Sequence, residues 1–181
     1  MKRINRRAGR SNRRQGLRFD YELVGSGWAL ATLTIGRKSI PMVVSYLNDS
    51  LGQLAAAIEA LSKRAKAAKA VFMAEPGEHQ VMFERAAGSN VAIDVVWYAD
   101  WRSWGMYDGP GVPRLKGTVP LAELHEQVVS VLGKLLARHG AAGYRKQWHE
   151  HDFPLAIYRR LGGTESPRRK PKIRRRRRRR S

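Results

Sequence analysis

The sequence predicts an α+β domain, with an antiparallel sheet of about six strands in two βββα-like halves and the helices on one face. Three observations support this class. Short segments of alternating apolar and polar residues are separated by hairpin-length turns, which connect antiparallel strands. Two longer segments have apolar residues at helical spacing. Basic segments without apolar periodicity flank this region, so we expect a globular domain over 18–161 between disordered basic arms over 1–17 and 162–181.

The first half is expected to contain three strands followed by a helix. The strands are expected over 18–24, 28–35 and 39–47. Gly25-Ser26-Gly27 supplies the first turn. Because Pro41 cannot donate a hydrogen bond within a sheet, the third strand is expected to lie at an edge or to begin late. Asn48-Asp49-Ser50 is typical of a helix start, and apolar residues follow at helical spacing from Leu51 to Ala65.

The second half is expected to repeat this order. Its strands are expected over 71–74, 79–85 and 91–99. A loop of roughly 18 residues follows over 100–117, which is long enough to be functional or mobile. Thr118 and Pro120 are expected to open a second helix that closes at His139-Gly140. The last segment, 143–161, is expected to be a short helix or turn, an extended break at Phe153-Pro154 and a terminal helical piece.

The charge of the chain is concentrated at its two ends. Residues 1–18 hold eight basic and no acidic residues, and residues 161–181 hold eleven basic residues and one acidic residue, Glu165. These two segments therefore carry +18 of the +20 formal charge, while the 142 residues between them are close to neutral at +2. This distribution favours a polyanion as partner, most often nucleic acid.

Arginine predominates in both arms, and its planar guanidinium binds phosphate oxygens at two points. Because neither arm contains an aromatic residue, we expect binding to phosphate without base reading, weakened by salt. An arginine run that arose by codon slippage, a tail that serves only solubility and a nuclear-import signal are the alternatives. The expected nucleic-acid-binding residues are Arg3, Arg6, Arg7, Arg10, Arg13, Arg14, Arg168, Arg169, Lys170, Lys172, Arg174, Arg175, Arg176, Arg177, Arg178, Arg179 and Arg180.

Composition argues against several other classes. Without cysteine, the chain has no disulfide, thiolate zinc site or catalytic thiol. No apolar run approaches the roughly 20 residues that span a bilayer. Asp20 and Glu22 interrupt the stretch after the basic start, which argues against a secretory signal. We therefore expect a cytoplasmic protein with no membrane span and no cofactor.

No catalytic set is recognisable, so we expect a protein that is not an enzyme. The chain has no Gly-x-Ser-x-Gly elbow, and Gly25-Ser26-Gly27 lacks the rest of a phosphate-loop pattern. Glu75 and Glu78 flank a Pro-Gly turn, where we expect both carboxylates to be solvated. His149 and His151 would share a metal only in an extended segment, and spacing places no third ligand, so we expect a surface turn and no metal site.

Aromatic residues gather around the loop of the second half. Trp97, Tyr98, Trp101, Trp104 and Tyr107 fall within eleven residues. Some of these rings are expected to cover the core, which is their commoner use, while exposed rings suit a protein partner or single-stranded bases. If the core has a protein partner, we expect it at Trp101, Trp104 and Tyr107. Trp104 is the ring expected to be exposed, because Ser103 and Gly105 flank it.

Several short motifs suggest a relationship. They are the Ser45–Leu51 segment, Glu75-Pro76-Gly77-Glu78, and Gly143-Tyr144 with Trp148 and Phe153-Pro154 after it. In these motifs the chain resembles a loose group of uncharacterised bacterial α+β proteins, some of them similar to the immunity proteins of polymorphic toxin systems. The resemblance covers about 19–161, implies a bacterial, cytoplasmic, non-enzymatic binding module and assigns no functional residue. Immunity proteins that block nucleases often present acidic surfaces, and the basic arms depart from that pattern.

Two functions follow as expectations. The first is sequence-independent nucleic-acid binding through the two arms. The alternative is a protein-interaction module of the immunity type, in which the 100–117 loop contacts the partner and the basic tails are incidental.

Overall fold

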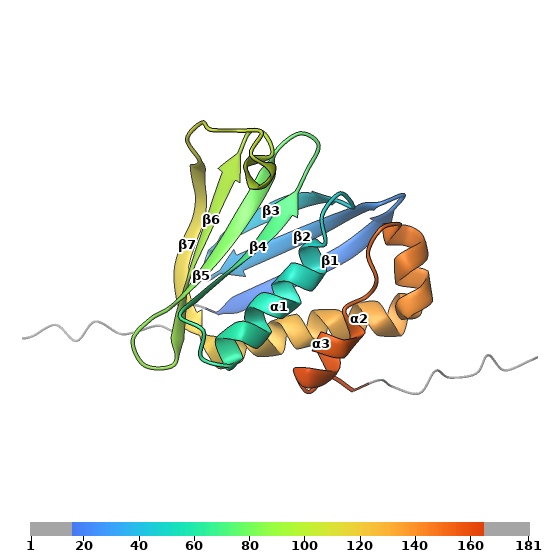
Figure 1. Ribbon diagram of the computed structural model, residues 1–181. Helices are drawn as coiled ribbons and strands as arrows, with labels where there is room; N and C mark the ends of the chain where they lie inside the picture. Colours follow the sequence, from blue (N-terminus) through green and yellow to red (C-terminus); the bar gives the residue numbers. More distant parts are fainter. Residues whose placement is uncertain (1–15, 165–181) are drawn as a thin grey trace, which may run out of the picture.

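The computed structural model describes residues 16–164. Within them the chain forms two antiparallel sheets, of three and four strands, and three α-helices (Figure 1). The elements are β1 (Leu17–Gly25), β2 (Trp28–Ile35), β3 (Lys38–Ser45), α1 (Ser50–Ser62), β4 (Ala67–Met73), β5 (Glu78–Arg85), β6 (Asn90–Tyr98), the 3₁₀ turn η1 (Arg102–Trp104), β7 (Val112–Pro120), α2 (Leu121–Trp148) and α3 (Leu155–Arg160). The α+β class is confirmed, and the two arms expected to be disordered lie almost entirely outside the described residues.

The first sheet has the order β1-β2-β3 and follows the alternation in its sequence. Phe19 of β1 lies opposite Leu33 of β2, and Leu33 lies opposite Ile40 of β3, so one face of the sheet is apolar and turned inward. β3 pairs only with β2 among the described strands, which confirms the edge position expected from Pro41.

The second sheet has the order β4-β5-β6-β7 and contains a strand that the sequence analysis missed. The sequence predicted a loop over 112–117 and the start of a helix at Thr118. Residues 112–118 all belong to β7 instead. Pro113 and Gly117 concealed the alternation, in which only Leu115 and Val119 are buried. Gly117 has a packing role, because a Cβ built there would lie 2.7 Å from Cγ2 of Ile35 in the first sheet.

The expectation of one sheet in two similar halves is also wrong, and the edge of β4 gives the reason. Gln53 of α1 accepts a hydrogen bond from the Val71 N–H through Oε1, at 3.0 Å. Asn48 donates Nδ2 to the Val71 carbonyl at 2.7 Å. These side chains occupy main-chain groups of β4 that would otherwise pair with another strand, so β4 ends its sheet.

Both sheets and two helices share one core. α1 packs along β4 and α2 along β1 (Figure 1). Phe19 of β1 and Phe72 of β4 meet edge to face with ring centroids 6.3 Å apart. Leu54 of α1 and Leu124 of α2 are buried beside them. Each such side chain contributes roughly 1.5–3 kcal/mol by leaving water.

The second helix is interrupted at the predicted position, His139-Gly140, and a further helical segment follows it under the same label α2. At Gly140 the backbone leaves helical geometry, with φ 66° and ψ 167°, and a second helical segment then runs to Trp148. Tyr144 and Trp148 are spaced one turn apart and are both fully buried, which draws this segment back onto the core. The expected break at Phe153-Pro154 is confirmed, and α3 follows it. Among the described residues, no helix is both long and apolar enough to cross a membrane.

Candidate binding surface on the β6–β7 loop

The loop between β6 and β7 covers residues 99–111 and is held in a defined conformation. Its centre is η1, where the Trp101 carbonyl accepts hydrogen bonds from the N–H groups of Trp104 and Met106, both at 3.1 Å. Gly105 closes this turn at φ 73°, a left-handed conformation that glycine adopts without strain. The tip of this long, glycine-rich loop is therefore a hydrogen-bonded turn.

A buried carboxylate attaches the loop to the sheet. Glu78 of β5 is 0% exposed. Its Oε1 accepts hydrogen bonds from the Ser103 N–H at 2.9 Å and from Nε2 of Gln80 at 2.6 Å, and its Oε2 accepts one from the Ser103 hydroxyl. The expectation that Glu78 is solvated is wrong, because the loop folds over it. Glu75 is exposed and accepts a hydrogen bond from the Ser45 hydroxyl.

Trp101 is the second attachment point. Its Nε1 donates a hydrogen bond to the Ala74 carbonyl at 2.8 Å, and the ring is half-buried. Trp104 packs edge to face against it, with ring centroids 5.2 Å apart. Trp101 therefore orients Trp104 rather than presenting its own face to solvent.

Tyr107 and Arg102 close the other side of the loop. The Tyr107 ring packs edge to face on Tyr98 at 6.4 Å, and the Arg102 guanidinium lies 5.1 Å from the centroid of the same Tyr98 ring. Arg102 also donates Nη1 to the Gly109 carbonyl at 3.3 Å. Of the three residues expected to contact a partner, Trp101 and Tyr107 are thus partly used to shape the loop.

The exposed tip consists of Trp104, 50% exposed, and Met106, 61% exposed, and we call these two residues the Trp104 surface. The exposure expected for Trp104 is confirmed. Met106 was not among the expected partner residues, which were all aromatic, although it directly follows Gly105. Tryptophan and methionine are enriched at protein interfaces. The loop and the start of β7 carry Asp100, Asp108, Arg102 and Arg114, so local charge favours neither an anionic nor a cationic partner.

The basic residues expected to bind nucleic acid, 3–14 and 168–180, lie outside the described residues. The described residues nevertheless contain a basic group where α1 ends. It consists of Lys63, Arg64 and Lys66, and no acidic partner is recorded for the last two within residues 16–164.

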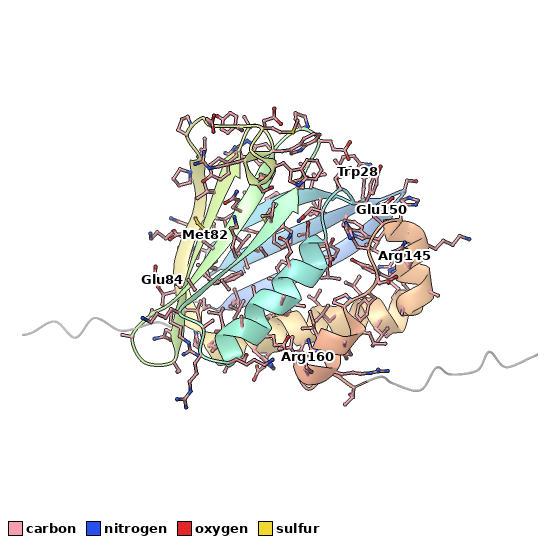
Figure 2. All side chains as sticks on the ribbon, in the orientation of Figure 1. Trp28, Met82, Glu84, Arg145, Glu150 and Arg160 are labelled. Atoms are coloured by element: carbon pink, nitrogen blue, oxygen red, sulfur yellow. The ribbon has the colours of Figure 1, made fainter. Side chains whose placement is uncertain are left out.

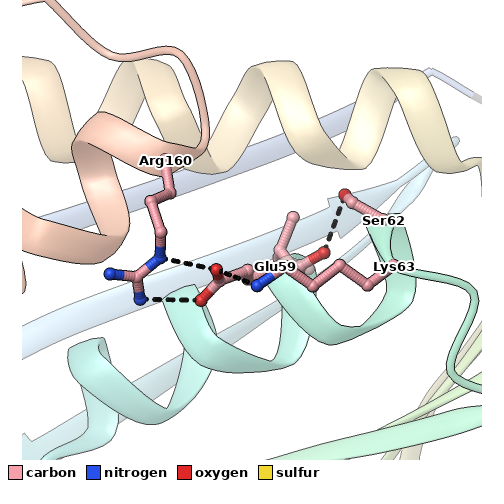
Figure 3. Close-up of polar contacts among 5 residues, drawn as sticks. Glu59, Ser62, Lys63 and Arg160 are labelled. Carbon is pink, nitrogen blue, oxygen red and sulfur yellow. Dashed lines mark hydrogen bonds and ion pairs between the residues drawn. The ribbon is translucent and has the colours of Figure 1, made fainter.

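A charge cluster joins this end of α1 to α3 (Figure 3). The carboxylate of Glu59 accepts two hydrogen bonds from Arg160, from Nε at 2.6 Å and from Nη2 at 3.0 Å, and one from Lys63 Nζ at 2.6 Å. Arg160, and then Lys63, hold the pKa of Glu59 down at about 2. Glu59 thus fixes α3 against α1 a few residues before the basic tail begins. Figure 2 shows Arg160 on the helical side of the molecule, away from Glu84 and Met82 on the second sheet.

The segment from His149 to Asp152 forms a turn. His149 lies at φ 66° and packs its ring on Tyr46 with centroids 5.6 Å apart. Arg145 donates Nη1 to the Glu150 carbonyl at 2.5 Å and pairs with Asp152 at 3.5 Å; Figure 2 shows Arg145 and Glu150 at the same end of α2. Within residues 16–164, no three His, Cys, Asp or Glu side chains are grouped so that they could hold a metal ion.

Comparison with known proteins leaves this surface without a named counterpart. No protein-family model matches the chain, and no curated protein or solved structure matches it. The resemblance to immunity proteins of toxin systems therefore stays a prediction.

Proposed function

We propose that this protein binds nucleic acid without sequence preference through its two Arg-rich ends, and that its folded domain is not an enzyme. The observation that carries the proposal is the distribution of charge. The described residues hold 17 basic and 14 acidic side chains, a net +3, so 17 of the 20 net positive charges lie in the 32 residues outside them. Dense arginine of this kind suits phosphate and releases counterions on binding.

The folded domain supports the proposal by where it begins and ends. Figure 1 shows the start of β1 and the end of α3 lying apart, so the two basic ends leave the domain at separate places. The basic residues at the end of α1 lie beside α3, because Glu59 contacts both Lys63 and Arg160. A nucleic acid that binds the C-terminal tail would therefore meet further cations on the domain.

Binding of fluorescently labelled duplexes of unrelated sequence, measured by anisotropy, tests this function. We expect dissociation constants that agree within about threefold across sequences and that rise steeply with salt, because phosphate contacts carry no sequence information. A preference of about a thousandfold or more for one sequence, the range of specific binders, would contradict the proposal.

A protein-interaction module is the second candidate, favoured by one observation. The Trp104 surface is apolar, exposed and held in place by Glu78 and Trp101, which lowers the entropy cost of binding. A pull-down from bacterial lysate, with and without nuclease, separates the two candidates. A protein that is retained after nuclease treatment and lost with Trp104→Ala would favour the interaction module.

A further inference from the structure

The turn that ends α1 has an arginine where glycine is usual. The Ala65 N–H donates to the Ala60 carbonyl at 2.9 Å and the Arg64 N–H to the Leu61 carbonyl at 3.0 Å, which is the hydrogen-bond pattern of a Schellman motif. Arg64 occupies the left-handed position of this motif, at φ 72°. Glycine is favoured there because it has no Cβ. An arginine at this position destabilises the turn relative to glycine, and such an outlier points to a role for its side chain.

The exposed side chain of Arg64 stands among other cations. Arg85 of β5 donates Nη2 to the same Leu61 carbonyl at 2.6 Å, so its guanidinium lies beside this turn. Lys66 is exposed two residues after Arg64. Glu59 brings two further cations to this end of the helix, one from α1 and one from α3 (Figure 3). We call the five basic residues the α1-end surface: Lys63, Arg64, Lys66, Arg85 and Arg160.

The positive charge of the folded domain is concentrated on this surface. Its five basic residues together with Glu59 carry a net +4. The other residues within 16–164 hold 12 basic and 13 acidic side chains, a net −1. Glu84 adjoins Arg85 in the sequence but points to the opposite face of β5, because successive side chains of a strand alternate. The α1-end surface is therefore the part of the described domain that suits an anionic partner.

The helix dipole opposes an anion at this end of α1, but its charge is much smaller than that of the surface. A helix C-terminus carries about −0.5 charge. The last carbonyls of α1 are also occupied, since the Glu59 carbonyl accepts from the Lys63 N–H at 3.0 Å and the next two accept within the turn. Favourable contact with the dipole explains a lysine at the helix end. It does not explain an arginine in a left-handed conformation.

We propose that the α1-end surface contacts the phosphate backbone of the nucleic acid that the C-terminal tail binds. Arg64 and Lys66 bind phosphate oxygens, Arg64 through its planar guanidinium. The first cation of the tail, Arg168, follows Arg160 by eight residues, so the tail and the surface act on the same nucleic acid and the second contact forms within one complex. This inference rests on the proposed function and adds the place on the domain at which the nucleic acid is held.

The test measures binding of a labelled DNA duplex to full-length variants by anisotropy. Arg64→Gly and Lys66→Gln each remove one cation from the surface, and Lys146→Gln removes one from an exposed position of α2 outside it. All three lower the net charge by one, so the general attraction of the chain for phosphate falls equally. We expect each surface variant to raise Kd about fivefold at about 0.15 M salt, and their combination to flatten the slope of log affinity against log salt by up to about 1.8. Lys146→Gln should change both little.

The melting temperature separates a binding arginine from a structural one. Because glycine relieves the left-handed strain, Arg64→Gly should melt at or above the wild-type temperature while it binds the duplex more weakly. A lower melting temperature would assign Arg64 to the fold and overturn the inference. Equal binding by the two surface variants and Lys146→Gln would also overturn it, and would leave the proposed function standing. A full-length wild-type chain that does not bind the duplex would contradict both.

Discussion

Two glutamates hold two parts of this domain in place, and they differ in the partners that bind them. Glu78 is fully buried under the β6–β7 loop and accepts hydrogen bonds from neutral donors, Ser103 and Gln80. Glu59 lies on the helical side and is bound by two cations, Arg160 and Lys63. A buried carboxylate is costly to leave unpartnered, whereas an ion pair whose cation is exposed, as Lys63 and Arg160 are, contributes less. The first glutamate therefore organises an apolar surface, and the second mainly positions a helix.

The largest effect is expected from Glu78→Ala. The substitution leaves the Ser103 N–H and hydroxyl and the Gln80 amide without their acceptor and opens a space beneath the loop, so the free energy of unfolding should fall by about 3 kcal/mol. Urea denaturation gives this value. Glu84→Ala, at an exposed position of the same strand, is the matched control and should stay within about 0.5 kcal/mol of wild type. Similar values for both variants would mean that Glu78 does not anchor the loop.

The two neighbouring tryptophans should behave differently. Trp101→Ala removes a half-buried ring and its hydrogen bond to Ala74, and should cost about 2 kcal/mol, less than for a fully buried ring. Trp104→Ala should lower the free energy of unfolding by about 1 kcal/mol or less, because it removes mainly one aromatic contact, with Trp101. Thermal melting of the two variants provides the comparison. A larger loss for Trp104 would assign its ring to the core and remove the Trp104 surface.

The smallest effect is expected from Glu59, and it depends on pH. Because Arg160 and Lys63 lower its pKa from 4.5 to about 2 in the folded state, its contribution is complete above about pH 4.5 and is lost as the pH falls toward 2. Glu59→Gln lacks this titration. Between about pH 5 and pH 3, where this contribution begins to be lost, the melting temperature of wild type should fall more than that of the variant.

His79 gives the control for that experiment. Burial, and then Arg114, lower its pKa to about 4, so it also destabilises the fold in acid. Wild type and Glu59→Gln both contain His79, so the difference between them isolates Glu59. Parallel melting curves across this range would show that the ion pair at Glu59 makes no contribution.

The sequence was most informative where local pattern decides structure. Six of the seven strands and the start of α1 followed from alternation and from the Asn48-Asp49-Ser50 segment, and Asp49 does cap α1 by accepting from the Gly52 N–H. The exposure of Trp104 followed from its small neighbours. β7 was not predicted, because proline and glycine, here Pro113 and Gly117, are typical of loops. Glycine is needed at position 117 because a larger side chain would collide with Ile35 in the other sheet.

The remaining errors come from contacts between distant residues. The division into two sheets depends on Gln53 and Asn48 reaching Val71, which no local pattern reveals. Likewise, the sequence around Glu78 indicates a solvated turn, and its burial results from contact with Ser103, which lies 25 positions later in the chain. The charge distribution can be counted from the sequence alone, and the proposed function is argued from it.

The central claim is that nucleic-acid binding depends mainly on the basic ends, and that the cations at the end of α1 only add to it. The most direct measurement is the slope of log affinity against log salt for a DNA duplex, with the full chain and with a chain lacking Arg174–Ser181. A variant with lysine in place of the seven arginines of this run is the control for charge alone. We predict that deletion weakens binding and flattens the slope by up to about 0.9 for each lost phosphate contact, while the lysine variant keeps most of the slope. An unchanged slope after deletion would show that the tail does not contact phosphate and would contradict the account.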